Sequence, residues 1–223
     1  MRQGRSMKST LEHLVFLPAS AGPGRIFPTI IAMHGRGADE NDLASVILAL
    51  EIPDLVLVTP RAPFPFPYGG YAWYSLEQEG VPEPEALQTS VGLVRKFVDE
   101  VRAEYPVDPK RLILLGFSQG AMMAYATGLS DPSMFRGIAA LSGYIPYQSR
   151  LPLQLAKLAG FSVFISHGSN DPVIPVQNGR EAAKLLTDAG ANVTYREYLM
   201  GHEIGDETIR DLKHWVLKVL RLS

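Results

Sequence analysis

The clearest candidate for chemistry in this chain is Ser118, which lies between two glycines in the Gly-Phe-Ser-Gln-Gly segment at 116–120. The run Arg-Leu-Ile-Leu-Leu at 111–115 predicts a short buried strand before this segment, and residues 121–126 predict the start of a helix after it. A serine at such a junction lies on a sharp turn, with its hydroxyl above the edge of the sheet. A hydroxyl is a good nucleophile only when a base accepts its proton. The segment therefore predicts a histidine base and an acid that orients it.

The base can be found by elimination, because the chain contains five histidines. Where a serine sits on this kind of turn, the acid and then the histidine follow it along the chain. His13 and His34 precede the serine, so both are in the wrong order. His167 ends an apolar run, and His214 faces away from the apolar side of the last predicted helix. His202 remains, in a loop after a predicted strand, and we assign it as general base and then general acid.

The acid must lie between the serine and His202. Asp131 and Asp188 occupy segments typical of helix ends, whereas Asp171 directly follows a predicted strand. Open α/β sheets place their sites at the carboxyl ends of strands. Taken alone, Asp171 would be interpreted as part of an ordinary turn before Pro172. Together with the serine and the histidine, it is the residue expected to orient the imidazole and stabilise its charged form.

Attack on a carbonyl carbon creates an oxyanion, which requires positioned N–H donors. The backbone N–H of Gln119 is one expected donor, because it follows the nucleophile at the start of a helix. A second should come from the glycine-rich loop 34–37, which follows the predicted strand at 28–33. We assign this role to the backbone N–H of Arg36, and we expect His34 to brace the loop by hydrogen bonding. A plain strand-to-loop turn is the alternative for this segment.

The elements that position these residues alternate between strand and helix. Such alternation predicts a mainly parallel sheet with helices on both faces, formed by a single domain spanning 1–223. We expect strands at 12–17, 28–33, 54–59, 111–116, 137–141, 161–166 and 193–199, and helices at 40–50, 84–104, 119–130, 150–158, 176–189 and 206–221. Residues 142–160 leave room for one short helix and no cap domain, so the site is expected to be open.

Aromatic residues crowd the segment 61–76, which follows the strand predicted at 54–59. The segment should therefore lie over the carboxyl edge of the sheet, where it could form an apolar wall of a substrate pocket. Trp73 is the residue that we assign to substrate binding. The alternative is that these aromatic residues anchor the loop to the core.

Composition excludes several classes of function. The net charge of −2 gives no basic surface for nucleic acid, and the lack of cysteine excludes disulfides, a thiol nucleophile and a cysteine metal site. No spacing of histidines and carboxylates suggests a metal, and the chemistry above requires no cofactor. No run approaches the ~20 apolar residues of a membrane span, and no secretory segment follows the basic residues 1–8, so we expect a cytoplasmic protein. Met7 is an alternative start to Met1.

These segments together resemble the phospholipase/carboxylesterase family, which includes bacterial carboxylesterases and acyl-protein thioesterases. The resemblance extends from about Leu14 to the end and rests on residues 34–37, 116–120, 171–175 and 201–203. It implies an α/β-hydrolase fold and hydrolysis of carboxylic esters, with lysophospholipid or thioester activity in some members.

The catalytic residues of that family map onto Ser118, Asp171 and His202, and its oxyanion donors map onto the backbone of Arg36 and Gln119. The chain departs from the family at two places. Arg36 stands where the family often has leucine, which introduces a cation near the mouth of the site. The family's Trp-aromatic-Asp pattern is Trp-Tyr-Ser at 73–75, without the acid.

Four alternative functions are compatible with this sequence. The first is a serine carboxylesterase for short- to medium-chain esters, acting through an acyl-serine intermediate. The second is a lysophospholipase or acyl-protein thioesterase, which a continuous apolar groove beside Ser118 would favour. A serine peptidase and a non-catalytic binding protein are the others. The expected partner is a small-molecule or lipid ester. The resemblance also implies a homodimer as one expected state, since some family members are dimers, and no feature here identifies an interface.

Overall fold

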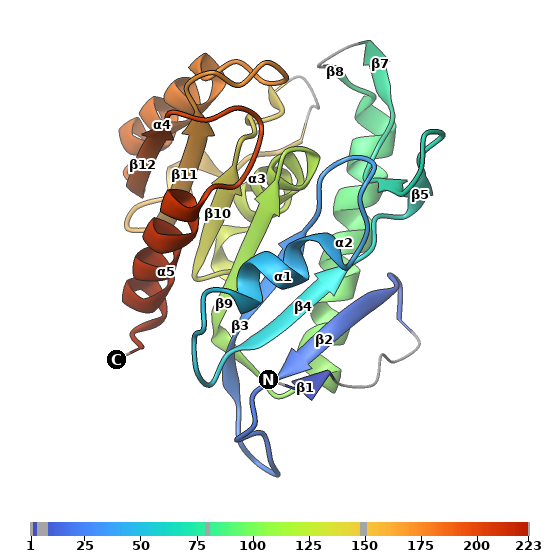
Figure 1. The fold of residues 1–223 in the computed structure, drawn as a ribbon, viewed down its shortest axis with the longest axis vertical. Helices are drawn as coiled ribbons and strands as arrows, with labels where there is room; N and C mark the ends of the chain where they lie inside the picture. The colour runs from blue at the N-terminus through green and yellow to red at the C-terminus, as the bar shows by residue number, and fades with distance from the viewer. Residues whose placement is uncertain (1, 4–8, 79–80, 148–150, 223) are drawn as a thin grey trace.

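The computed structural model describes residues 2–3, 9–78, 81–147 and 151–222 and is drawn in Figure 1. Its main sheet has eight strands among these residues, in the order β1-β2-β4-β3-β9-β10-β11-β12. β2 pairs antiparallel with β1 and β4, and the other pairs are parallel. The strands are β1 (Arg2–Gln3), β2 (His13–Leu17), β3 (Phe27–Met33), β4 (Val56–Pro60), β9 (Val107–Phe117), β10 (Gly137–Leu141), β11 (Ser162–Gly168) and β12 (Asn192–Tyr198).

Helices cover both faces of this sheet (Figure 1). They are α1 (Asp42–Leu48), α2 (Pro84–Glu104), α3 (Gln119–Ser130), α4 (Gln177–Asp188) and α5 (Asp206–Leu220). The sequence of β3 is mostly apolar because the strand is buried on both faces. Ile31 and Met33 pack in the core that contains α2, α3 and α4, whereas Ile30 and Ala32 pack in the core that contains α1 and α5. A strand buried on both faces has no polar side to alternate with.

The α/β-hydrolase fold predicted from the sequence is confirmed, and so are the seven predicted strands and five of the six predicted helices. The helix predicted at 150–158 is wrong over the described part, 151–158, which contains only the 3₁₀ turn Leu155–Lys157. Pro152 explains the difference, since it lacks an N–H and disfavours helical backbone at the preceding residue. Residue 150 lies outside the described residues.

Two small hairpins were not predicted. β5 (Phe64–Pro65) pairs with β6 (Tyr71–Ala72), and β7 (Leu76–Gln78) pairs with β8 (Val81–Pro82). Both lie beyond the carboxyl end of β4 (Figure 1). Between β10 and β11, the described residues form no element larger than the 3₁₀ turn, so no cap domain is present there. Among the described helices, none is both long and apolar enough to span a membrane.

Candidate active site

The turn between β9 and α3 holds Ser118 in a strained conformation. Its φ of 53° and ψ of −120° are values that residues with a side chain seldom adopt. The flanking glycines are required by close packing. A Cβ on Gly116 would overlap the carbonyl oxygen of Gly120, and a Cβ on Gly120 would overlap the carbonyl oxygen of Met33. The turn is therefore set by backbone contacts that only glycine permits, and it projects Ser118 from the edge of the sheet.

A chain of two short hydrogen bonds links the three residues that the sequence singled out. Ser118 Oγ lies 2.8 Å from His202 Nε2, and His202 Nδ1 lies 2.7 Å from Asp171 Oδ2. The His202 ring also packs 4.9 Å from the Phe117 ring, measured between centroids. With Nδ1 donating to the carboxylate, Nε2 is free to accept the proton of the serine hydroxyl. The structure thus brings together a hydroxyl, an imidazole and a carboxylate from separate loops, in the order that a nucleophile, a base and an orienting acid require.

The loops carrying the acid and the histidine meet because β11 and β12 are parallel neighbours. Gly168, at the end of β11, approaches so closely that a Cβ would overlap the Gly201 carbonyl oxygen. Just beyond, the Asn170 N–H donates to the Met200 carbonyl at 3.1 Å. These contacts place His202 beside Asp171, and no spacing along the sequence reveals them.

Asp171 is held as an ionised carboxylate. Its buried Oδ1 accepts from the N–H groups of Val173 and Ile174 at 2.8 and 2.9 Å. Burial opposes ionisation of this group, but the hydrogen bonds from His202 and from those two N–H groups outweigh it, so the pKa of Asp171 is lower than usual. His167 Nε2 lies 3.4 Å from Asp171 Oδ2 and donates to the Ile174 carbonyl at 2.8 Å. This contact of a buried histidine with the acid could not be predicted from the sequence.

The loop after β3 lies against the serine. A Cβ on Gly35 would lie 3.5 Å from the Ser118 Cβ. His34 braces the loop as predicted: its Nδ1 donates to the Gly35 carbonyl at 2.7 Å, and its Nε2 accepts from the Ala62 N–H at 3.0 Å. Burial lowers the pKa of His34, which keeps the ring neutral and so preserves both bonds.

Two backbone N–H groups beside the serine have no acceptor among the described residues. The N–H groups of neighbouring residues are engaged, since Gly37 donates to the Tyr71 carbonyl and Ser118 donates to the Leu141 carbonyl. In the described part of the chain, the backbone N–H groups of Arg36 and Gln119 donate no hydrogen bond. A pair of unused donors at a strained serine is the arrangement that can stabilise a developing oxyanion.

Comparison with known proteins agrees with this geometry. The model of one protein family, described as phospholipase/carboxylesterase, matches residues 21–220. The chain belongs to this family. Like its relatives it is a serine hydrolase, and its fold is that of bacterial carboxylesterases.

Two curated relatives and one solved structure illustrate the likeness. Acyl-protein thioesterase 1 of Kluyveromyces lactis is 29% identical over 160 residues, which cover 68% of this chain and 70% of the relative. A probable carboxylesterase of Arabidopsis thaliana, described as SOBER1-like, is 27% identical over 210 residues, 87% of this chain and 79% of the relative. The Bacillus cereus carboxylesterase structure superposes with a TM-score of 0.83 at 25% identity, covering 95% of this chain and 96% of that one.

The prediction that Trp73 contacts substrate is wrong. Trp73 has no exposed surface, and its indole N–H donates to the His34 carbonyl at 2.9 Å. The Gln119 side chain ties the same segment to the serine turn, accepting from the Trp73 N–H at 2.8 Å and donating to the Tyr74 carbonyl at 2.9 Å. Trp73 therefore supports the loop before Arg36 from within the core. A large aromatic residue next to a site is buried when the loop carrying it folds back onto the sheet.

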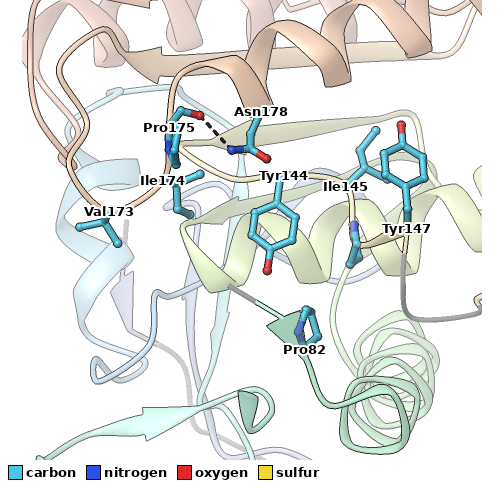
Figure 2. Close-up of a pocket in the computed structure, with 9 residues that line it drawn as sticks. Pro82, Tyr144, Ile145, Tyr147, Val173, Ile174, Pro175 and Asn178 are labelled. Carbon is cyan, nitrogen blue, oxygen red and sulfur yellow. Dashed lines mark hydrogen bonds between the residues drawn. The ribbon is translucent and has the colours of Figure 1, made fainter. Parts of the chain in front are cut away.

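The cavity at the serine is small and lies between two larger ones. It measures about 80 Å³ and is lined by Arg36, Tyr74, Leu76, Ser118, Gln119, Met122, Tyr144, Val173 and Ile174. A pocket of about 530 Å³ adjoins it on the Arg36 side and shares Tyr74 and Leu76 with it. A pocket of about 280 Å³ adjoins it on the Val173 side (Figure 2), where the Tyr144 ring extends toward Pro82.

Most of these lining residues were not predicted from the sequence. One signal could have found Met122, because it follows Ser118 by one helical turn and so lies on the same side of α3. Tyr144 and Ile174 reach the cavity from loops beyond β10 and β11, and only the tertiary structure shows this.

Proposed function

We propose that this serine hydrolase is a carboxylesterase for short- to medium-chain esters. The observation that carries the proposal is the hydrogen-bond chain from Ser118 Oγ through His202 to Asp171, built on a serine held at a φ of 53°. A protein that only bound esters would have no need of this strain or of an aligned base. We propose a single catalytic domain, because one sheet carries all three residues. The cytoplasmic location and the homodimer stay predictions.

In the first step, Ser118 Oγ attacks the ester carbonyl carbon while His202 Nε2 takes its proton. The tetrahedral oxyanion accepts hydrogen bonds from the unused N–H groups of Arg36 and Gln119. His202 then gives the proton to the leaving alkoxide oxygen, and an acyl-serine remains. Asp171 keeps the imidazole in the required tautomer and stabilises its cationic form.

In the second step, a water molecule gives its proton to His202 and attacks the acyl-serine carbonyl. The second tetrahedral intermediate collapses, His202 returns the proton to Ser118, and the carboxylic acid leaves. Both steps use the same donors and the same base, so loss of either serine or histidine should stop turnover.

The size of the serine cavity supports short chains, and the adjoining pockets leave room for medium ones. About 80 Å³ beside Ser118 accommodates only a few carbon atoms before the walls formed by Tyr74, Met122 and Tyr144. The Tyr74 hydroxyl donates to Met122 Sδ at 2.9 Å, which holds two of these walls together. A longer chain must extend into an adjoining pocket.

The alternative is a lysophospholipase or acyl-protein thioesterase acting on long acyl chains. The 530 Å³ pocket favours it, because this pocket adjoins the serine cavity and is lined by Phe64 and Phe66. One of the relatives is described as an acyl-protein thioesterase. A groove running through both cavities would hold a long chain.

Hydrolysis of p-nitrophenyl esters from acetate to palmitate, with wild type and Ser118→Ala side by side, tests the proposal. Serine-dependent activity that peaks between acetate and octanoate is the expected result. A peak at palmitate would transfer the assignment to the long-chain alternative. No hydrolysis at any length would refute both.

A further inference from the structure

Arg36 is the one cation among the described residues that line the serine cavity, and it also lines the 530 Å³ pocket beside it. Its guanidinium lies over the Phe66 ring, 5.4 Å from the ring centroid, and the residue is exposed. The positive charge also acts on Tyr144: burial raises the pKa of that hydroxyl to about 12, and Arg36 opposes the rise. The guanidinium thus stands where the two cavities meet.

Within the described part of the chain, no carboxylate neutralises the charge of Arg36. Several other arginines have carboxylate partners there: Arg61 pairs with Glu40, Arg95 with Asp131 and Arg180 with Glu197. For Arg36, no carboxylate or hydrogen-bond acceptor is found among the described residues, and its contact is the Phe66 ring. A guanidinium that is positioned by an aromatic ring but not neutralised is available to an anion.

The acyl half of an ester is the half that would extend toward Arg36. His202 must reach the leaving oxygen, so the alcohol half lies on the side of the loops that carry the histidine and the acid. The 280 Å³ pocket is on that side, since it is lined by Val173, Ile174 and Pro175, just after the acid. The Arg36 pocket contains no described residue of those loops. It is therefore left for the acyl group.

We propose that the preferred substrates are half esters of dicarboxylic acids, whose free carboxylate pairs with Arg36 while the methylene chain packs against Tyr74 and Leu76. This proposal rests on the proposed esterase function and specifies its substrate class. A planar guanidinium offers two parallel N–H groups to a carboxylate, which gives orientation as well as attraction. An apolar pocket without a cation would instead favour neutral chains of the same length.

The test compares two ethyl esters of equal chain length and similar size that differ in charge. Monoethyl glutarate carries the free carboxylate, and ethyl 5-methylhexanoate has an isopropyl group in its place. Release of acid from each is followed by titration at constant pH, and the quantity measured is the ratio of kcat/KM for the two esters. Effects of a mutation on the oxyanion donors act on both esters and cancel in this ratio.

We expect wild type to favour the half ester and Arg36→Gln to lower the ratio at least about fivefold, with Arg36→Lys retaining more of it than Arg36→Gln. The wild-type ratio should also fall as salt rises, because ions screen the pair. Arg25→Gln is the matched control. Arg25 lies just before β3, whereas Arg36 lies just after it, and the Arg25 guanidinium also lies over an aromatic ring, 5.0 Å from the Phe27 ring centroid. The Arg25→Gln substitution therefore removes the same charge at the opposite edge of the sheet.

A ratio that is unchanged in Arg36→Gln, or that falls equally in Arg25→Gln, would overturn the proposal. So would a wild-type preference for the neutral ester. If wild type hydrolyses neither ethyl ester, binding decides the role of Arg36, and the p-nitrophenyl ester series decides separately whether the proposed function fails. Calorimetry of monoethyl glutarate with Ser118→Ala should then show affinity at least about fivefold higher than with Ser118→Ala/Arg36→Gln; equal affinities would refute the carboxylate site.

Discussion

Replacing Asp171 by asparagine should destroy catalysis while leaving the fold nearly intact. The buried Oδ1 accepts from the N–H groups of Val173 and Ile174, and an asparagine oxygen can keep both bonds. The amide nitrogen then faces His202 Nδ1, where a 2.7 Å bond to a carboxylate oxygen lies in the wild type. Two donors cannot share this position, so the imidazole must place its proton on Nε2. In that tautomer it donates toward Ser118 and no longer accepts.

The expected loss follows from this exchange of tautomer. Loss of the base should lower kcat by about 10⁴-fold, which corresponds to about 5 kcal/mol of activation free energy. The free energy of unfolding should fall by only about 1–3 kcal/mol, since one charge-assisted hydrogen bond is lost.

Initial rates with p-nitrophenyl butyrate and urea unfolding measure the two quantities. Asp188→Asn is the matched control, because Asp188 is exposed and pairs with Lys184 on the surface. It should leave both quantities within experimental error. If Asp171→Asn kept kcat within tenfold of wild type, the reasoning from the tautomer would be refuted.

Three further predictions follow from the packing. Gly120→Ala should lower kcat/KM at least about 100-fold, because its Cβ would overlap a backbone carbonyl and displace the serine turn, whereas Gly92→Ala, with open space around it, should leave kcat/KM unchanged. Trp73→Phe should lower the free energy of unfolding by about 1–3 kcal/mol in urea, since the buried His34 carbonyl loses its donor; no change would contradict the supporting role. The pKa of Asp171 is below its ordinary value of 3.8, so its carboxylate stabilises the fold above that pH and loses this effect as acid protonates it. Asp171→Asn should therefore weaken the dependence of the free energy of unfolding on acid pH. An identical dependence in wild type and mutant would refute this prediction.

The sequence predicted the parts of this molecule that rest on local patterns. The strand at 137–141 and the inner part of β9 at 112–115 are apolar runs, and the turn at Ser118 is marked by two glycines between a strand and a helix. The order of serine, acid and histidine could be predicted because the chain contains few candidate residues for each role. These features depend on near neighbours in the chain, and they were predicted to within a few residues.

Features that depend on contacts between distant segments could not be predicted from the sequence. The hairpins β5–β6 and β7–β8 have strands of two or three residues, too short to show a period. The burial of Trp73 depends on a hydrogen bond to His34, 39 residues away. The sequence marked Arg36 as a cation near the mouth of the site, but its position over Phe66 required the structure.

The central claim is that Ser118 forms a covalent acyl intermediate, and labelling with a p-nitrophenyl alkylphosphonate tests it most directly. We predict that one equivalent of p-nitrophenol is released per enzyme molecule, that activity is lost in proportion, and that peptide mass spectrometry places the phosphonate on Ser118. Ser118→Ala should take up no label. A phosphonate found on another residue, or an enzyme that keeps hydrolysing esters without any label on Ser118, would contradict the account.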